Sequence, residues 1–201
     1  MKIALSLMLI VLSQCAASTA EASCKDAGTR LNRFASADQQ IRAEWDALQQ
    51  DARATDADKA ALQERMRTID ATNLKQVQEI IDVCGWPKDK KASHTAWLLV
   101  QHADSDIAFQ KKAKDLLEAS VMAGIGAPSD LAYLADRIAS NENRPQEYGT
   151  QFTQTDRCTL KLLPVDDIEQ VKRRRQAIGL PSMEEYEAEG RRRSIPADCA
   201  K

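Results

Sequence analysis

Apolar side chains recur at helical spacing along most of this chain. Ile41, Trp45 and Leu48 occupy positions i, i+4 and i+7, which lie on one face of an α-helix. Later segments repeat this spacing, with apolar residues at Leu62, Met66 and Ile69, at Leu74, Val77, Ile80 and Ile81, and at Leu131, Leu134 and Ile138. Residues 96–100 are apolar on every side, which indicates a buried helix. The pattern predicts a mainly α protein.

Capping residues predict where the helices begin, because their side chains bond the free backbone N–H groups of the first turn. The predicted starts are Ser36, Thr55 or Asp56, Asp70, Ser93, Asp106, Pro128, Asp167 and Ser182. Gly85, Gly124 and Gly179 are predicted to mark helix ends, since glycine tolerates the backbone angles found there. We therefore expect successive helices with short breaks, and an exposed loop at residues 88–91.

Residues 148–163 depart from the helical pattern. Thr, Phe, Tyr and Leu residues surround a polar turn at residues 155–157, an arrangement typical of a β-hairpin. No segment repeats with a period of 20–50 residues, so a solenoid is not expected. The predicted fold class is mainly α, a multi-helix single domain with one small β-hairpin near residues 148–163.

The first residues have the pattern of a cleavable signal peptide. Lys2 precedes an apolar run at residues 3–12, and the Ala-Glu-Ala sequence at residues 20–22 matches a cleavage site. The run has about ten residues, whereas a helix needs ~20 to cross a bilayer. We expect residues 1–22 to be removed and residues 23–201 to form one periplasmic or secreted helical domain without a stable membrane anchor. A retained anchor is the alternative.

The cysteines agree with export. Cys15 belongs to the predicted leader, and the four others are Cys24, Cys84, Cys158 and Cys199. An even number favours disulfide bonds in an oxidising compartment, and the spacings match no zinc pattern. Of three possible connectivities we favour Cys24–Cys84 with Cys158–Cys199, because each pair ties one terminus to the body of the domain. Lipoprotein processing at Cys15 or Cys24 is an alternative that the preceding residues fit poorly.

Composition narrows the classes of partner. Charged residues make up 29% of the chain and aromatic residues 4%, and the formal net charge is -2. No domain-wide basic face is indicated, so nucleic acid is not an expected partner. The arginine runs at residues 173–175 and 191–193 lie within acidic segments, and we interpret them as solvated helix faces.

A set of motifs resembles a known family. The motifs are Asp70-x-x-Asn73, Gly85-Trp86-Pro87, the segment WLLVQHAD-x-D-x-x-FQ from Trp97 to Gln110, Tyr133-Leu134-x-Asp136-Arg137, and Pro145-Gln146-x-Tyr148-Gly149-Thr150-Gln151. Together they look like a bacterial family known only as a domain of unknown function. The resemblance covers most of residues 40–190, and it departs from the family pattern at Ile107, where proline often follows the aspartate, and in the cysteines. It implies a domain outline and no particular activity.

The polar end of the buried helix is the first candidate site. Gln101, His102 and Asp104 follow the apolar centre, and Asp106 and Gln110 lie just beyond. Buried groups of this kind must be hydrogen-bonded or line a wet cleft. We predict catalytic roles for His102, Asp104 and Asp106, with His102 as a general base or proton shuttle that one of the two aspartates orients.

Ligand-binding residues are predicted at the same helix end and in the segment 144–151. The planar guanidinium of Arg137 can hold an anionic group. The segment 144–151 offers amide and hydroxyl groups from a turn that leads into the hairpin. The predicted ligand-binding residues are Gln101, Gln110, Asp136, Arg137, Gln146, Tyr148 and Gln151.

The same residues have structural interpretations. Asp104 and Asp106 are natural helix caps, each stabilising by about 1 kcal/mol. Asp136 and Arg137 can form an ion pair that holds two helices, and the segment 144–151 can be a turn stabilised by its own side chains. A ligand site and a structural polar junction therefore both remain open at this point.

Metal and covalent chemistry have little support in the sequence. The two histidines, His94 and His102, are eight residues apart, or ~12 Å along a helix, and cannot share an ion. His102 with aspartates alone is a thin ligand set for zinc. No serine lies in a nucleophile elbow, and the cysteines are expected to be oxidised. We expect no metal site and no cofactor.

Two function hypotheses follow. The first is an exported domain that binds a polar small ligand, or carries weak hydrolase-type chemistry, in a cleft of His, Asp, Arg and Gln side chains. The second is a protein-binding accessory factor, such as an inhibitor or immunity-type protein, without catalysis. The first predicts that His102, Asp104, Arg137 and Gln151 converge on one pocket; the second predicts that they are buried and bond one another.

Overall fold

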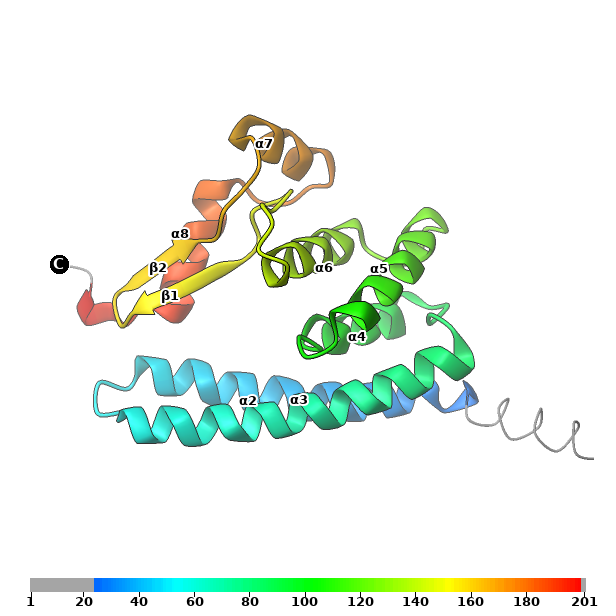
Figure 1. Ribbon diagram of the computed structural model, residues 1–201, viewed down its shortest axis with the longest axis horizontal. Helices are drawn as coiled ribbons and strands as arrows, with labels where there is room; N and C mark the ends of the chain where they lie inside the picture. Colours follow the sequence, from blue (N-terminus) through cyan, green and yellow to red (C-terminus); the bar gives the residue numbers. More distant parts are fainter. Residues whose placement is uncertain (1–23, 200–201) are drawn as a thin grey trace, which may run out of the picture.

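The computed structural model describes residues 24–199, which form seven α-helices, one two-stranded sheet and a short 3-10 helix, η1. In chain order the elements are α2 (Ala27–Gln50), α3 (Asp56–Cys84), α4 (Lys90–Gln101), α5 (Ile107–Met122), α6 (Pro128–Asn141), β1 (Phe152–Asp156), β2 (Thr159–Leu162), α7 (Ile168–Ala177), α8 (Met183–Ser194) and η1 (Ala197–Cys199). Figure 1 shows their arrangement. The mainly α fold with one small hairpin is confirmed. The predicted signal peptide lies outside the described residues.

The two longest helices, α2 and α3, lie side by side and antiparallel along one side of the molecule (Figure 1). Thr55 begins α3 in a capping box with Asp58, and Gly85 follows its last residue with φ 72°. The predicted helix starts at Ser36 and Asp70 are wrong, because both residues lie inside continuous helices. No proline or glycine interrupts α3, so a residue that can cap a helix has no break to cap there.

Helix α4 packs against α2, α3, α5 and α6. It begins after Asp89, whose carboxylate accepts a hydrogen bond from the backbone N–H of Ala92. The predicted start at Ser93 and the loop expected up to residue 91 are therefore one turn too late. Ser93 is buried inside α4, where its hydroxyl accepts a hydrogen bond from the Trp86 indole at 2.8 Å.

The hydrophobic core forms where α4 meets its four neighbours. Its fully buried side chains include Leu31, Val77, Ile80, Ala96, Leu99, Val100, Ala113, Leu117 and Leu134. These residues come from α2 to α6, and Val100 and Ala103 at the C-terminal end of α4 both belong to the core, so Gln101 and His102 lie against it. That position decides which side chains surround His102.

The later boundaries follow the local signals. Asp106 caps α5, Pro128 is the first residue of α6, Asp167 caps α7, and Ser182 caps α8 in a capping box. At each of these starts except that of α6, the side chain accepts a hydrogen bond from a backbone N–H group in the first turn of the helix. Interactions within a few residues therefore determine these boundaries.

Strands β1 and β2 form an antiparallel hairpin with a register irregularity between Gln154 and Asp156. Helix α8 contacts both β2 and α2, so it connects the hairpin with the long helical pair. In Figure 1 the hairpin, α7 and α8 lie on the same side of the α2–α3 pair as α6.

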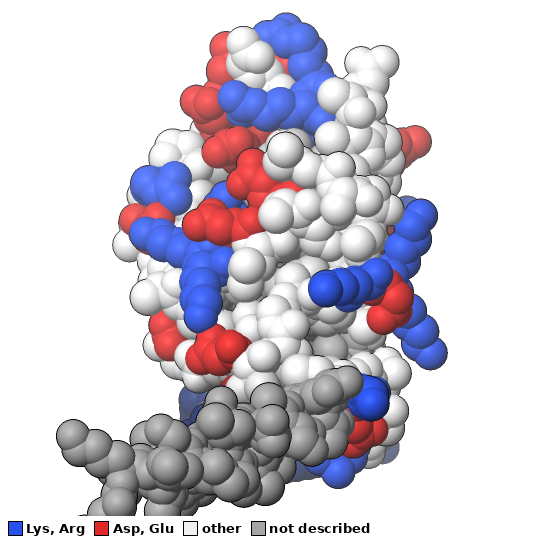
Figure 2. All heavy atoms as spheres, turned by 90° about the vertical axis from the view of Figure 1, so that its right-hand side faces the viewer, with Lys and Arg blue, Asp and Glu red and all other residues white. Residues whose placement is uncertain are grey.

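Two disulfide bonds join Cys24 with Cys84 and Cys158 with Cys199. The favoured connectivity is thus confirmed: the first bond joins the start of α2 to the end of α3, and the second joins the hairpin turn to η1. None of the helices in residues 24–199 combines the length and the apolar character that crossing a bilayer requires. Figure 2 shows a face on which basic and acidic side chains are interspersed.

Candidate functional site

His102 is the residue after α4, and its partner comes from α2. Its ring nitrogen Nδ1 lies 2.7 Å from Oδ1 of Asp38, a residue 64 positions earlier in the chain. The Asp38 carboxylate is completely buried. A neutral imidazole that donates its Nδ1 proton to a carboxylate keeps Nε2 as the proton acceptor. The pair therefore has the geometry of an oriented general base.

The second ring nitrogen of His102, Nε2, is not fully buried. No described residue forms a hydrogen bond with Nε2, and Nε2 is not among the buried polar atoms that lack a partner. The side chain retains 18% of its exposure. A ligand or a water molecule can therefore reach the nitrogen that accepts the proton.

The expected orienting role of Asp104 or Asp106 is not what the structure shows. Asp106 accepts the backbone N–H of Phe109 as the cap of α5, and it also accepts a hydrogen bond from Gln78. Asp104 binds Arg137 instead. Both aspartates follow the turn that ends α4, whereas His102 is directed toward α2. The packing of α4 on α2 thus replaces the local partner by a distant one.

A second carboxylate and a guanidinium adjoin the pair. Nη2 of Arg42 lies 2.5 Å from Oδ1 of Asp70 and 3.3 Å from Oδ1 of Asp38. Burial raises the pKa of Asp38, but the hydrogen bond from His102 and the charges of His102 and Arg42 outweigh it and leave the pKa below its ordinary value. Burial raises the pKa of Asp70, and Arg42 only partly offsets this effect.

Asp38, Asp70 and His102 each offer a ligand atom for a metal ion, and these atoms lie within 4.8 Å of one another. Arg42 already bridges the two carboxylates with its guanidinium, so it supplies the positive charge that a metal ion would bring. One imidazole and two aspartates are also fewer nitrogen and sulfur ligands than zinc prefers. This cluster therefore already holds the cation that its carboxylates need. His94 pairs with Asp130 and is separate from it.

The Asp38 carboxylate makes a pH-dependent contribution to stability. Its pKa is lowered in the folded state, so the stabilisation is complete above the unfolded pKa of ~3.9 and is lost as the pH falls through the lower folded value. We expect the difference in unfolding free energy between the wild type and Asp38→Asn to be largest at neutral pH and to shrink below about pH 4. Urea unfolding at pH 7, 5 and 3 measures it. If the difference in unfolding free energy between the wild type and Asp38→Asn stays constant down to pH 3, the pKa of Asp38 is not lowered by folding.

A second polar network joins the α4–α5 turn to α6 and to Gln151, the residue before β1. Arg137 donates two hydrogen bonds to the Asp104 carboxylate, at 2.9 and 2.8 Å, and a third to the side-chain oxygen of Gln151 at 3.0 Å. Gln110 and Asn141 also donate to Asp104. The structure thus brings four of the predicted residues together, and their polar atoms bond one another.

Asp136 organises the turn that follows α6. It does not pair with Arg137, as the structural interpretation expected; its carboxylate accepts the backbone N–H groups of Glu147, Tyr148 and Thr150 at 2.8, 3.0 and 2.9 Å. Burial raises the pKa of Asp136, against the lowering effect of these three donors. Asp136 therefore holds the backbone of the turn.

The remaining predicted residues have separate positions. Gln146 is buried and bonds the backbone of Gln151 and Leu163. Gln101 donates to the carbonyl oxygen of Tyr133, and its own side-chain oxygen is buried without a partner. The Tyr148 side chain lines a cleft of about 520 Å³ between α5 and α6. The ligand-binding roles of these residues stay predictions.

One family of known sequences matches this chain. The model of a family of unknown function, DUF6624, matches residues 26–189. The chain belongs to this family. No curated protein and no solved structure matches it.

The DUF6624 match bears out the resemblance to an uncharacterised domain family. It begins nearer the N-terminus than the expected residues 40–190, so it includes the whole of α2, and Cys24 lies just before it. Asp38, Asp70 and His102 all lie within the matched range. Each disulfide joins one cysteine inside this range to one outside it.

Sequence reasoning missed Asp38 and Arg42 in this DUF6624 domain. One signal was available: the buried positions of α2 are Leu31, Ala35, Asp38 and Ile41, so Asp38 interrupts an apolar stripe. A charged residue on a buried helix face needs a partner. The sequence does not indicate which residue that partner is, because it comes from another helix.

Proposed function

We propose that this DUF6624 protein is an exported domain that acts on a polar small ligand, with His102 as its general base. One observation carries the proposal: a buried aspartate holds Nδ1 of His102, while Nε2 has no hydrogen-bond partner among the described residues and is not fully buried. This is the arrangement in which a carboxylate orients an imidazole and stabilises its protonated form. The matching reaction class is hydrolase-type chemistry, in which Nε2 removes a proton from water or from a ligand hydroxyl group.

The neighbouring charges suit a polar ligand. Asp70 and Arg42 are partly exposed, with 25% and 23% of their side-chain surface accessible, so both can form hydrogen bonds with a molecule next to His102. Arg42 also offsets one of the two carboxylate charges. When Nε2 takes up a proton, the positive charge on the ring is balanced by Asp38 at 2.7 Å. Oriented general-base catalysis of this kind typically contributes 10²–10⁴-fold to the rate.

Export is the second part of the proposal. Two disulfide bonds are typical of proteins that fold in the periplasm or outside the cell, because the cytosol keeps thiols reduced. The leader pattern in residues 1–22 supports the same compartment. Both features are compatible with a periplasmic or secreted protein.

The test uses the mature protein, with intact disulfides, in a thermal-shift screen against polar metabolites and cell-wall fragments. A ligand that binds the folded state raises the melting temperature. We expect at least one such ligand to raise the melting temperature of the wild type, and His102→Gln to lose most of this shift. For a ligand that is turned over, His102→Gln is expected to lower kcat/KM by about 10²–10⁴-fold.

Asp38→Asn tests whether catalysis needs the imidazole to be oriented by a carboxylate, or only to be present. Asparagine keeps the size of the side chain but cannot balance a protonated ring, so kcat is expected to fall while KM changes little. Asp115→Asn, on the exposed surface of α5, is the matched control and is expected to leave both parameters unchanged. The proposal is wrong if the ligand raises the melting temperature of His102→Gln as much as that of the wild type. It is also wrong if the smaller rise is fully explained by a loss of stability in the variant without ligand.

A protein-binding accessory function is the second candidate, and the Asp104–Arg137 network supports it. The members of this network bond one another, as expected for residues that shape a fold. Under this function, His102→Gln leaves binding to a partner protein unchanged, and no small ligand raises the melting temperature.

A further inference from the structure

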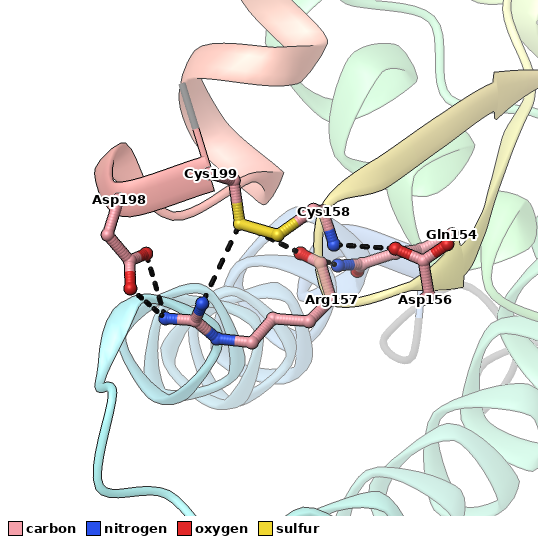
Figure 3. The surroundings of a disulfide bond; sticks show 6 residues. All are labelled: Gln154, Asp156, Arg157, Cys158, Asp198 and Cys199. Atoms are coloured by element: carbon pink, nitrogen blue, oxygen red, sulfur yellow. Dashed lines mark hydrogen bonds and ion pairs between the residues drawn. A yellow bond between two sulfur atoms is a disulfide. The ribbon is translucent and has the colours of Figure 1, made fainter. Parts of the chain in front are cut away.

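The Cys158–Cys199 disulfide lies at the surface, between the hairpin and the C-terminal end of the described chain. Figure 3 shows Cys158 in the turn between β1 and β2, and Cys199 in η1. Cys158 is exposed, whereas Cys199 and both cysteines of the other disulfide are only partly exposed. An incoming thiol must approach a disulfide sulfur directly, so Cys158, the more exposed residue of the pair, is the expected point of attack.

Arg157 stands beside the other sulfur. Its Nη1 lies 3.7 Å from Sγ of Cys199, and its Nη2 lies 2.9 and 3.0 Å from the carboxylate oxygens of Asp198 (Figure 3). Asp198 therefore holds the guanidinium next to Cys199. A positive charge with an N–H donor stabilises a thiolate, and a sulfur that leaves as a stabilised thiolate leaves faster.

A cleft opens beside this bond. Its volume is about 380 Å³, and its lining includes both cysteines, the apolar residues Ile195 and Pro196, and the cations Arg191 and Arg192. Arg191 and Arg192 pair with Glu187 and Glu189 on the exposed face of α8. The lining fits a small thiol that carries a carboxylate group, because the apolar wall accepts its carbon atoms and the arginines attract its charge.

We propose that Cys158–Cys199 is a thiol–disulfide exchange site for a small anionic thiol, with Cys158 as the attacked sulfur and Cys199 as the leaving group. The thiol loses its proton to solvent and attacks Sγ of Cys158. A new S–S bond forms between the thiol and Cys158 as the Cys158–Cys199 bond breaks, and its electron pair leaves on Cys199. Arg157 stabilises the resulting thiolate.

The test incubates the full mature chain with reduced glutathione under native conditions. The reaction is stopped early by alkylation, and peptide mass spectrometry identifies the modified cysteines. We expect glutathione on Cys158 and the alkyl group on Cys199, at a rate at least ten times that of any adduct on Cys24 or Cys84. We expect this ratio because Cys158 is more exposed than Cys24 and Cys84, and because Arg157 stabilises the thiolate that leaves on Cys199.

Variants test the role of the guanidinium. Arg157→Gln is expected to slow formation of the adduct several-fold, and Asp198→Asn, which releases the guanidinium, to slow it less. Arg67→Gln, which removes an exposed ion-paired arginine on α3, is the control and is expected to react at the wild-type rate. Unchanged melting curves show that the variants are folded. His102→Gln is expected to react normally, because the exchange site is independent of the proposed general base.

Three outcomes overturn the proposal as a whole, and a fourth overturns its preference for an anionic thiol. The first is an adduct that forms on Cys199, or first on Cys24 or Cys84. The second is an Arg157→Gln variant that reacts as fast as the wild type. The third is a Cys158–Cys199 bond that glutathione leaves intact unless denaturant is present. A rate that is no higher with glutathione than with 2-mercaptoethanol, compared at equal thiolate concentration, contradicts the binding role of the cleft.

Discussion

Replacement of Asp136 by alanine is expected to lower the free energy of unfolding by about 4 kcal/mol. The Asp136 carboxylate is completely buried and accepts three backbone N–H groups, from Glu147, Tyr148 and Thr150. Alanine leaves these donors without an acceptor, and each buried unsatisfied donor costs ~1–3 kcal/mol. Urea unfolding, followed by circular dichroism, measures the loss.

Two further variants show whether the loss comes from these hydrogen bonds. In Asp136→Asn one side-chain oxygen remains as an acceptor, so about half of the loss is expected. Asp115→Ala removes an aspartate whose side chain is 75% exposed, and a change within about 0.5 kcal/mol is expected. If Asp136→Ala is no less stable than Asp115→Ala, the carboxylate does not hold the turn.

Removal of the Cys24–Cys84 disulfide is expected to have an effect of similar size. The cysteines are 60 residues apart, and the loss of such a cross-link increases the entropy of the unfolded chain by an amount worth about 4 kcal/mol. For a domain of this size we expect the melting temperature of Cys24→Ser/Cys84→Ser to fall by about 12 °C. Calorimetry under oxidising conditions, without reductant, measures the shift.

The second disulfide supplies the matched comparison. Cys158 and Cys199 are 41 residues apart, and because the entropy depends on the logarithm of the loop length, Cys158→Ser/Cys199→Ser is expected to lose nearly as much stability. The two bonds are thus expected to be similar in thermodynamic effect and different in their rates of exchange with thiols. If Cys24→Ser/Cys84→Ser has the same melting temperature as the wild type, the expected stabilisation by the Cys24–Cys84 bond is refuted.

Much of the secondary structure could be predicted because its determinants are local. Asp106, Asp167 and Ser182 cap helices at the predicted positions, since each side chain bonds a backbone N–H group two or three residues away. The same local reasoning failed at Ser36 and Asp70. Both can cap a helix, but neither stands at a break, and packing of α2 against α3 keeps both helices continuous.

The candidate site could be predicted only in part. The position of His102 at the end of an apolar helix, and the charges of Asp104 and Arg137, drew attention to these residues, and their functional roles stay predictions. The assignment of Asp104 or Asp106 as the partner of His102 was wrong. Which carboxylate reaches an imidazole depends on how α4 is rotated and packed on α2, and this depends on many contacts in the core.

The sequence by itself determined the helical composition, the later helix boundaries and the hairpin, because each of these depends on residues that are close together in the chain. The tertiary structure alone decided that Asp38 bonds His102 and that Arg42 bridges Asp38 and Asp70. It also decided that Asp136 accepts hydrogen bonds from the backbone of a turn and does not pair with Arg137. These contacts join residues up to 64 positions apart. They form only when the helices pack. Burying an unpaired charge costs several kcal/mol of folding free energy, so each buried charge pairs with the oppositely charged or polar group that the packed helices bring close to it.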